Sequence, residues 1–308
     1  MSRGALRLLQ LTATVLGLLL GLEVLCRVQP EGLAAVAHRV RFKLALLHAK
    51  GAVDFVALGS SRTNDGLNPA LLGAGTGFSA ATPSSSLPTL EYFAEHLGPQ
   101  RRVLVELSVP MSSPNAMDLD PAPTSTNDGD PIGALLQDHS ALIRVRRAFA
   151  LENLPRVFGL LFASSLDGSE WFRSRQLIET FRPPLPPPGV QDDAAWKPYL
   201  HDLTAPHALD ADGERIAAGY TRALTVLREG GAKVVLISPP LGAGWRAEEC
   251  TPERIALRAE VARRTAAPLL DFTCAEVDER WFVDGQHLSS PGRAKYSKVL
   301  GEALRALP

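Results

Sequence analysis

The chain has 308 residues, of which 45% are hydrophobic, and its 32 basic and 33 acidic side chains leave a net charge of -1. This length and hydrophobic content suffice for one large α/β domain or two small ones, and they exclude a disordered chain. The balanced charge excludes the broad basic surface with which proteins bind nucleic acid or other polyanions. We therefore expect no nucleic acid among its partners.

The N-terminus carries an apolar segment behind two basic residues. Arg3 and Arg7 precede the run 8–22, which is followed by Glu23. A membrane-spanning helix needs about 20 apolar residues, and this run reaches that length only if Glu23 lies near the far interface. Basic residues before such a run favour a cytoplasmic N-terminus and an exported remainder. We expect an uncleaved membrane anchor over residues 1–27, with a cleaved signal peptide or a buried helix as the alternatives.

Three cysteines bear on the compartment. Cys26 lies in the predicted anchor, which leaves Cys250 and Cys274 as the only pair that can meet in a folded domain. Outside the cytoplasm these two can form a disulfide. Two unbonded, buried thiols are the alternative, because the sequence does not give the separation of their Cα atoms.

The predicted elements alternate between helices and strands. Residues 28–52 are expected to form a juxtamembrane helix, because apolar and basic positions interleave at helical spacing. Short apolar runs bounded by turn residues are typical of buried parallel strands; they lie at 53–58, 102–109, 233–238 and 268–272. Helical patterns follow at 214–229, 252–266 and 291–307, the last with Ser289 or Ser290 as N-cap. This alternation predicts a parallel sheet with right-handed crossovers.

One stretch interrupts the alternation. Residues 131–181 are helical in pattern and lead into a proline-rich linker at 183–188. We interpret residues 115–210 as an insertion between sheet strands, a lid or docking surface that helps to select the substrate. A second small domain is the alternative, although so short a stretch makes only a small core.

A serine follows the first predicted strand. Ser61 ends the motif Gly59-Ser60-Ser61 directly after the run 53–58. In open parallel sheets the functional site lies at the carboxyl ends of the strands, so Ser61 is placed where a nucleophile would work. If the next residues begin a helix, its first amides point to the same place and stabilise an oxyanion. Taken alone, the motif is more often a small-residue turn in which Ser60 or Ser61 caps a helix.

A base for this serine is expected near the C-terminus. The segment 281–292 contains Asp284-Gly285-Gln286-His287 directly before the last predicted helix. A three-residue offset across an Asp-Gly turn lets the Asp284 carboxylate reach one ring nitrogen of His287 and leaves the other free to face Ser61. We therefore expect the Ser61 hydroxyl oxygen within about 3–4 Å of a His287 ring nitrogen. A histidine at a helix entry with no partner is the alternative for His287 alone.

Together the two motifs resemble the SGNH (GDSL-like) hydrolase superfamily. There the first strand ends in Gly-Asp-Ser and a late Asp-x-x-His precedes the last helix; here Ser60 stands in the place of the Asp, whereas Asp284 and His287 match fully. The Gly-Ser-Ser variant with an N-terminal anchor is similar to the branch that contains the membrane-anchored D-alanine transfer protein of teichoic acid synthesis. The resemblance implies a Ser61–His287–Asp284 triad and a flavodoxin-like three-layer domain.

The resemblance also implies an oxyanion hole. Its donors in the family are a backbone amide after the nucleophile, a Gly in a second loop and an Asn in a third. In this sequence Gly77 or the amide of Ala81 corresponds to the second donor. The third loop lacks Gly-x-Asn-Asp; Asn115 is a candidate only by proximity, and Ser108 is another. Arg62, beside the nucleophile, is expected either to bind an anionic substrate group or, in a structural role, to pair with an acid at the sheet edge.

Three other patterns are weaker. The segment Gly77-Phe78-Ser79-Ala80-Ala81 approaches the Gly-x-Ser-x-Gly turn of α/β-hydrolases but lacks the final Gly. The segment 73–77 has no following Lys, so it is not a phosphate-binding loop. His201, Asp202 and His207 match no zinc-binding spacing. We therefore expect neither a metal ion nor a cofactor.

These features predict an SGNH-type α/β domain over residues 53–308, held outside the cytoplasm by the anchor and a juxtamembrane helix. It is expected to cleave or transfer an ester-linked acyl group of a cell-envelope glycan or lipid, with Ser61 as nucleophile. Whether water or a sugar hydroxyl accepts the acyl group is left open. The alternative, favoured by the missing third-loop Asn, is a non-catalytic scaffold of this fold that binds envelope polymer or a membrane protein partner.

Overall fold

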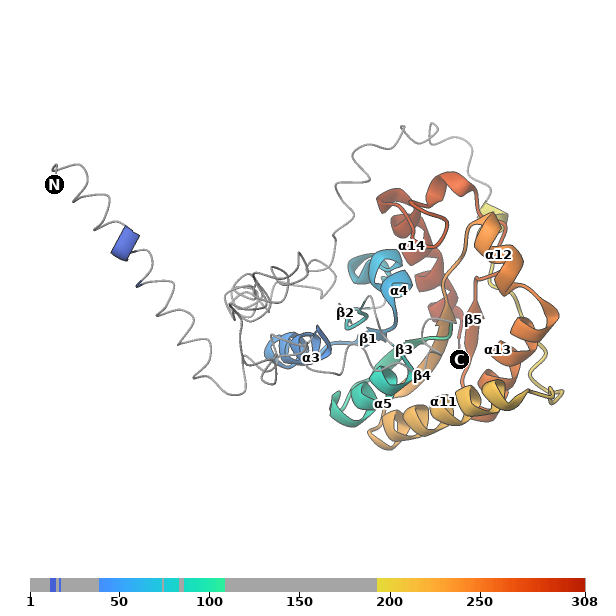
Figure 1. Cartoon of the computed structure of the whole chain (residues 1–308), viewed down its shortest axis with the longest axis horizontal. Helices are drawn as coiled ribbons and strands as arrows, with labels where there is room; N and C mark the ends of the chain where they lie inside the picture. Colours follow the sequence, from blue (N-terminus) through green and yellow to red (C-terminus); the bar gives the residue numbers. More distant parts are fainter. Residues whose placement is uncertain are drawn as a thin grey trace, which may run out of the picture.

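A sheet of five parallel strands forms the centre of the computed structural model, which describes residues 39–73, 75–82, 86–108 and 193–307, with 12–14 and 17 near the N-terminus. The strands lie in the order β2-β1-β3-β4-β5. They are β1 (Phe55–Leu58), β2 (Gly77–Ser79), β3 (Arg102–Glu106), β4 (Lys233–Ser238) and β5 (Leu269–Asp271). From β1 the chain first winds to one side and then to the other, so the winding direction reverses between β1 and β3 (Figure 1).

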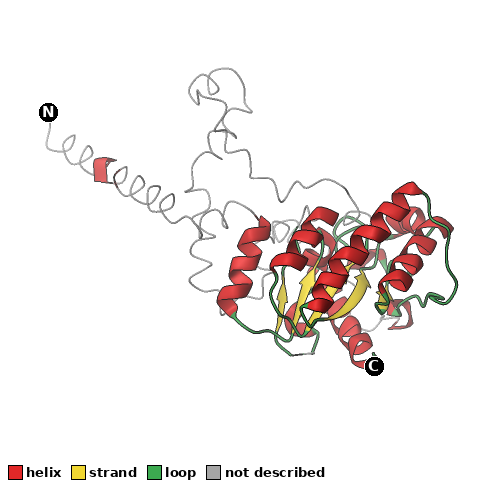
Figure 2. Ribbon diagram, turned by 90° about the horizontal axis from the view of Figure 1, so that it is seen from below, coloured by secondary structure: helices red, strands yellow, loops and turns green. Residues whose placement is uncertain are grey.

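Helices cover both faces of this sheet (Figure 2). Successive residues of a strand face opposite sides: Val56 and Leu58 join one hydrophobic cluster, and Phe55 and Ala57 join the other. The first face is covered by α3 (Arg39–Lys50), α5 (Leu87–His96), α11 (Ala211–Glu229) and α13 (Pro252–Thr265). The second face is covered by α14 (Ser290–Ala306), which also contacts α4 (Ser61–Gly66) and η1 (Pro69–Leu71). The chain is therefore an α/β protein with both faces of its sheet buried.

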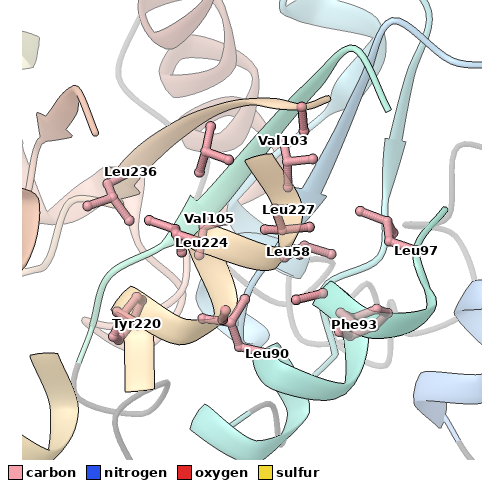
Figure 3. Packing of buried hydrophobic residues seen from close by; sticks show 14 of the residues in the cluster. Leu58, Leu90, Phe93, Leu97, Val103, Val105, Tyr220, Leu224, Leu227 and Leu236 are labelled. Carbon is pink, nitrogen blue, oxygen red and sulfur yellow. The ribbon is translucent and has the colours of Figure 1, made fainter. Parts of the chain in front are cut away.

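The larger cluster shows why these segments become helices and strands. Figure 3 shows side chains of α5 and α11 packed on those of β1, β3 and β4. Both helices present apolar residues at three-to-four spacing, which forms one apolar stripe; they are Leu90 and Phe93 on α5 with its C-cap Leu97, and Tyr220, Leu224 and Leu227 on α11. The Tyr220 hydroxyl does not stay unpaired in this core, since it donates to the carbonyl oxygen of Glu106 at 2.8 Å.

The expected parallel sheet is confirmed, with one more strand than the sequence predicted. The missing strand, β2, has three residues, and its one large apolar side chain, Phe78, stands between a glycine and a serine. So short a segment gives no alternating pattern. The helices α5 and α12 (Ala243–Glu249) were also not predicted. The helices α11, α13 and α14 begin and end within a few residues of the expected positions, and Ser289 is the N-cap of α14.

Several expectations concern residues outside the described part. The predicted anchor falls there almost entirely, as do residues 28–38 of the juxtamembrane helix and 115–192 of the insertion. Among the described residues, no helix combines the length and the apolar character needed to cross a membrane. Residues 193–210, the end of the predicted insertion, pack on the domain: Trp196 is buried, and the Tyr199 amide donates to the Asp271 carbonyl.

Polar contacts fasten the β5 side of the sheet. Asp271, the last residue of β5, is fully buried, and its carboxylate accepts hydrogen bonds from His201 Nε2 at 2.7 Å and Arg258 Nε at 2.6 Å. Nearby, Cys250 and Cys274 form a disulfide with Cα atoms 5.8 Å apart, so the pairing left open by the sequence is made. The disulfide joins the end of α12 to the loop after β5. Within the described residues, no group of three or more potential metal ligands lies together.

The contacts of Asp271 predict that the free energy of unfolding depends on pH in the acid range. Burial alone raises the pKa of Asp271, but the His201 hydrogen bond and the Arg258 charge outweigh burial and lower the pKa from 3.8 to about 2. A carboxyl with a lowered pKa stabilises the fold above its unfolded value, and this contribution is lost as the pH falls through about 2. We expect it to be about 2 kcal/mol. Asp271→Asn should lower the free energy of unfolding at pH 7. Between pH 5 and pH 2, the free energy of unfolding measured with urea should fall less steeply for this variant than for the wild type. Parallel curves would contradict this account.

Candidate active site

The candidate site lies at the carboxyl edge of the sheet, where the winding direction reverses. Ser61 is the first residue of α4 and follows β1 by two residues, Gly59 and Ser60. Glu106 ends the neighbouring strand β3. In doubly wound sheets this reversal opens a crevice, and ligands bind there. Ser61 therefore stands at the place where the topology leaves room for a substrate.

Ser61 meets the C-terminal motif here. His287 Nε2 lies 2.8 Å from Ser61 Oγ, although the two residues are 226 positions apart in the chain. His287 Nδ1 lies 2.8 Å and 3.0 Å from the two carboxylate oxygens of Asp284. The separation expected from the sequence was about 3–4 Å. The structure thus brings all three predicted residues into one hydrogen-bonded chain.

A small hairpin holds the histidine and the aspartate. Phe282 pairs with Leu288 in an antiparallel bridge, and the Val283 amide donates to the His287 carbonyl at 2.7 Å. Gly285, at the tip, has a φ of +77°, a value that favours glycine. The Asp284 carboxylate also accepts the amide of His287 at 3.0 Å, so it fixes both the backbone and the ring of the histidine.

The electrostatics of the pair decide where the protons lie. Partial burial raises the pKa of Asp284, but hydrogen bonds and the charge of His287 outweigh it, and the pKa is lowered overall. An ionised Asp284 can only accept hydrogen bonds, so His287 Nδ1 carries a proton and donates a hydrogen bond to the carboxylate. Nε2 then presents a lone pair to Ser61 Oγ. This is the arrangement in which an imidazole removes the proton of a serine hydroxyl.

Glu106 is part of this site and was not singled out from the sequence. Its carboxylate is fully buried and accepts five hydrogen bonds around the nucleophile turn. The donors are the amides and hydroxyls of Ser60 and Thr63 and the hydroxyl of Ser108. The available signal was an acidic residue inside an otherwise apolar strand, because a charge in such a place is rarely buried without partners.

Gly59 allows the turn to lie against this carboxylate. A Cβ atom at position 59 would stand 2.5 Å from Glu106 Oε2 and 2.5 Å from the Thr63 hydroxyl oxygen. Distances this short are not found for real Cβ atoms. The glycine of the Gly-Ser-Ser motif is therefore required by close approach of the backbone to Glu106.

The residues predicted for the oxyanion hole lie in different parts of the chain relative to Ser61. Gly77 lies level with Phe55, at the amino end of β1, so the structure does not bring it to Ser61. A Cβ there would collide with the Phe55 ring, which gives Gly77 a packing role instead. Ala81 is buried. It lies at the same edge of the sheet as Ser61, since the amide of the neighbouring Thr82 donates to the Gly59 carbonyl. Asn115 lies outside the described residues.

Arg62 is buried beside the turn that carries Ser61. Its side chain is 4% exposed, and Nη2 donates to the carbonyl oxygen of Pro239 at 2.5 Å. Burial lowers the pKa of Arg62, and the Glu106 carboxylate acts against this shift. The expectation that Arg62 binds an anionic substrate group is thus not supported by its position. Its positive charge instead lies in the same buried region as the charge of Glu106.

No protein-family model matches the chain, and no curated protein matches it in sequence. The fold and the geometry of the site therefore carry the functional argument.

Gly59 provides a test of this site. We expect Gly59→Ala to displace the turn from Glu106, to lower the free energy of unfolding by about 1–3 kcal/mol, and to disturb the Ser61–His287 contact. Gly244→Ala is a matched control, because a Cβ at exposed position 244 of α12 meets no atom within 4 Å. The control should be neutral or slightly stabilising. If both variants had the same free energy of unfolding in urea, a Cβ atom would fit at position 59, which would contradict the close approach of the turn to Glu106.

Proposed function

We propose that this protein is a serine esterase or O-acyltransferase that acts on an acyl ester of a cell-envelope glycan or lipid. The observation that carries the proposal is the continuous chain of hydrogen bonds from Ser61 through His287 to Asp284 at the carboxyl edge of the sheet. A hydroxyl, a base and an orienting carboxylate in this order form an activated nucleophile. The three residues come from the two ends of the domain and meet at this edge of the sheet.

The geometry supports a two-step acyl transfer. Ser61 Oγ attacks the ester carbonyl while His287 Nε2 takes its proton. The tetrahedral intermediate then releases the alcohol, which receives that proton from His287, and the acyl group stays on Ser61. In the second step water or a sugar hydroxyl attacks the acyl group, again losing its proton to His287, which returns one to Ser61. Asp284 stabilises the imidazolium and keeps Nδ1 protonated throughout.

The negative charge of the tetrahedral intermediate needs a donor. In the nucleophile turn the amides of Ser60 and Thr63 donate to Glu106, and the Arg62 amide donates to the Ser60 hydroxyl. The Ser61 amide has no acceptor among the described residues. We assign the first oxyanion donor to the Ser61 amide rather than to the amide that follows it, and the Ala81 amide remains the candidate from the second loop.

Fold and motifs support the SGNH-type assignment. The superfamily expectation requires a parallel sheet, a nucleophile after the first strand and an Asp-x-x-His before the last helix. The sheet is present, and Ser61 and His287 occupy these positions. The chain departs from the superfamily pattern at position 60, where a serine replaces the acidic residue, and in the third loop, which lacks Gly-x-Asn-Asp.

Two further features support an envelope location and substrate. The Cys250–Cys274 disulfide is typical of proteins outside the cytoplasm, as expected for a domain behind an N-terminal anchor. Trp245 on α12 lies against Gly285 beside the triad and is 43% exposed. An exposed indole at this place offers an apolar face to a sugar ring or an acyl chain.

Covalent labelling tests the proposal directly. A fluorophosphonate probe should form an adduct on Ser61 of the purified protein, because the probe traps an activated serine. Ser61→Ala should abolish the adduct, and His287→Ala should slow its formation by at least about 100-fold. Mass spectrometry of the labelled peptide locates the adduct. An unlabelled wild type of native fold would favour the non-catalytic scaffold.

Asp284 provides a second test. Asp284→Asn should keep the hairpin, because the amide oxygen still accepts the His287 amide, but it favours the wrong ring tautomer. We expect the rate of ester hydrolysis with a p-nitrophenyl acyl ester to fall by about 10²–10⁴. Asp278→Asn is the control, since Asp278 pairs only with Arg280 among the described residues. Equal rates for both variants would remove Asp284 from the mechanism.

A further inference from the structure

The nucleophile turn is held by a single buried carboxylate from another strand. Glu106 Oε2 accepts the Ser60 amide at 2.8 Å, the Thr63 amide at 3.3 Å and the Thr63 hydroxyl at 2.6 Å. Oε1 accepts the hydroxyls of Ser60 at 2.8 Å and Ser108 at 2.5 Å. Both flanks of Ser61 are thus tied to one side chain.

We propose that Glu106 is the positioning residue of the nucleophile: its ionised carboxylate fixes the turn 60–63 so that Ser61 Oγ stays in line with His287. In the Gly-Asp-Ser form of this motif the carboxylate stands at position 60 itself; here strand β3 supplies it from position 106. This inference rests on the proposed function, because positioning has a kinetic meaning only if Ser61 is a nucleophile.

The chemistry of the contacts favours an ionised carboxylate. Two of the five donors are backbone amides, which cannot reverse their role, so the oxygen facing them must accept. Hydrogen bonds to an ionised acceptor are about twice as strong as neutral ones, which offsets the cost of burying the charge. The buried guanidinium of Arg62 contributes a compensating charge, since Glu106 raises the pKa of Arg62 against the effect of burial.

The arrangement links Glu106 to catalysis rather than to folding alone. Ser61 is held through β1, β3 and Glu106, whereas His287 is held by the separate hairpin 282–288 before α14. A loosened turn therefore moves the serine relative to its base. An error of about 1 Å between reacting groups costs about 10²-fold in rate. The loss should fall on the chemical step and leave probe binding unchanged.

Glu106→Gln separates the charge from the shape. The Gln carbonyl can still accept the two amides and the Thr63 hydroxyl, while the hydroxyls of Ser60 and Ser108 rotate to accept from the new NH₂ group. The variant should fold. We expect its maximum rate constant of fluorophosphonate labelling to fall about 10–100-fold, with the half-saturating probe concentration within about twofold of the wild type.

Ser60→Asp provides the rescue. In the wild type it places a second carboxylate where the Ser60 hydroxyl lies 2.8 Å from Glu106, so like charges meet, and labelling should slow. In the Glu106→Gln background the same substitution returns a carboxylate to the turn, which also caps α4, and the labelling rate should rise at least about fivefold. The effect of Ser60→Asp thus reverses its sign between the two backgrounds.

The outcomes are distinct when labelling and thermal unfolding are measured on all four proteins. A slowed chemical step in Glu106→Gln with rescue by Ser60→Asp supports the proposal. A lower melting temperature with an unchanged labelling rate shows a structural role only and overturns it, as does Ser60→Asp slowing labelling equally in both backgrounds. No labelling of the wild type overturns the proposed function and this inference together, whereas labelling of the wild type and Glu106→Gln at equal rates overturns this inference alone.

Discussion

The buried carboxylate of Glu106 is the constraint on which the site depends. A charge taken out of water costs several kcal/mol unless donors replace the water, and five hydrogen bonds do so here. All but one of these donors belong to Ser60 and Thr63, so the energy that keeps the charge buried also keeps the turn closed. Position 59 must therefore be a glycine, because only a residue without a side chain fits between the turn and the carboxylate.

The second half of the site depends on packing. The hairpin that carries His287 is continuous with α14, which covers the second face of the sheet and contacts α4. Leu288, Tyr296 and Leu300 belong to the same buried cluster as Leu67, which directly follows α4. The contact between Ser61 and His287 therefore joins two segments that share one hydrophobic core, which explains how residues 226 positions apart come within 2.8 Å of each other.

The sequence was informative where a pattern is local. Four of the five strands are continuous apolar runs bounded by turn residues, and the helices α11, α13 and α14 have clear helical periodicity. The Asp284–His287 offset is set by one turn. The sequence was uninformative where a role depends on a contact between distant residues. Gly77 looked like a loop glycine because Phe55, which requires it, is 22 positions away on the neighbouring strand. Glu106 was overlooked for the same reason, since its partners lie on the turn after β1.

The exposure of Asp284 is compatible with its role because its orientation is fixed by the backbone. Its side chain is 42% exposed, yet the amides of Gln286 and His287 both donate to it. The hairpin is also held from the other side: the Gly242 amide donates to the Gly285 carbonyl at the start of α12, and the disulfide at Cys250 fastens the end of that helix. Water at Asp284 screens the electrostatic interaction between its carboxylate and the imidazole of His287. The hydrogen-bond geometry still fixes the tautomer of the ring. The serine half of the site is thus held by a buried charge, and the histidine half by backbone hydrogen bonds and a covalent bond.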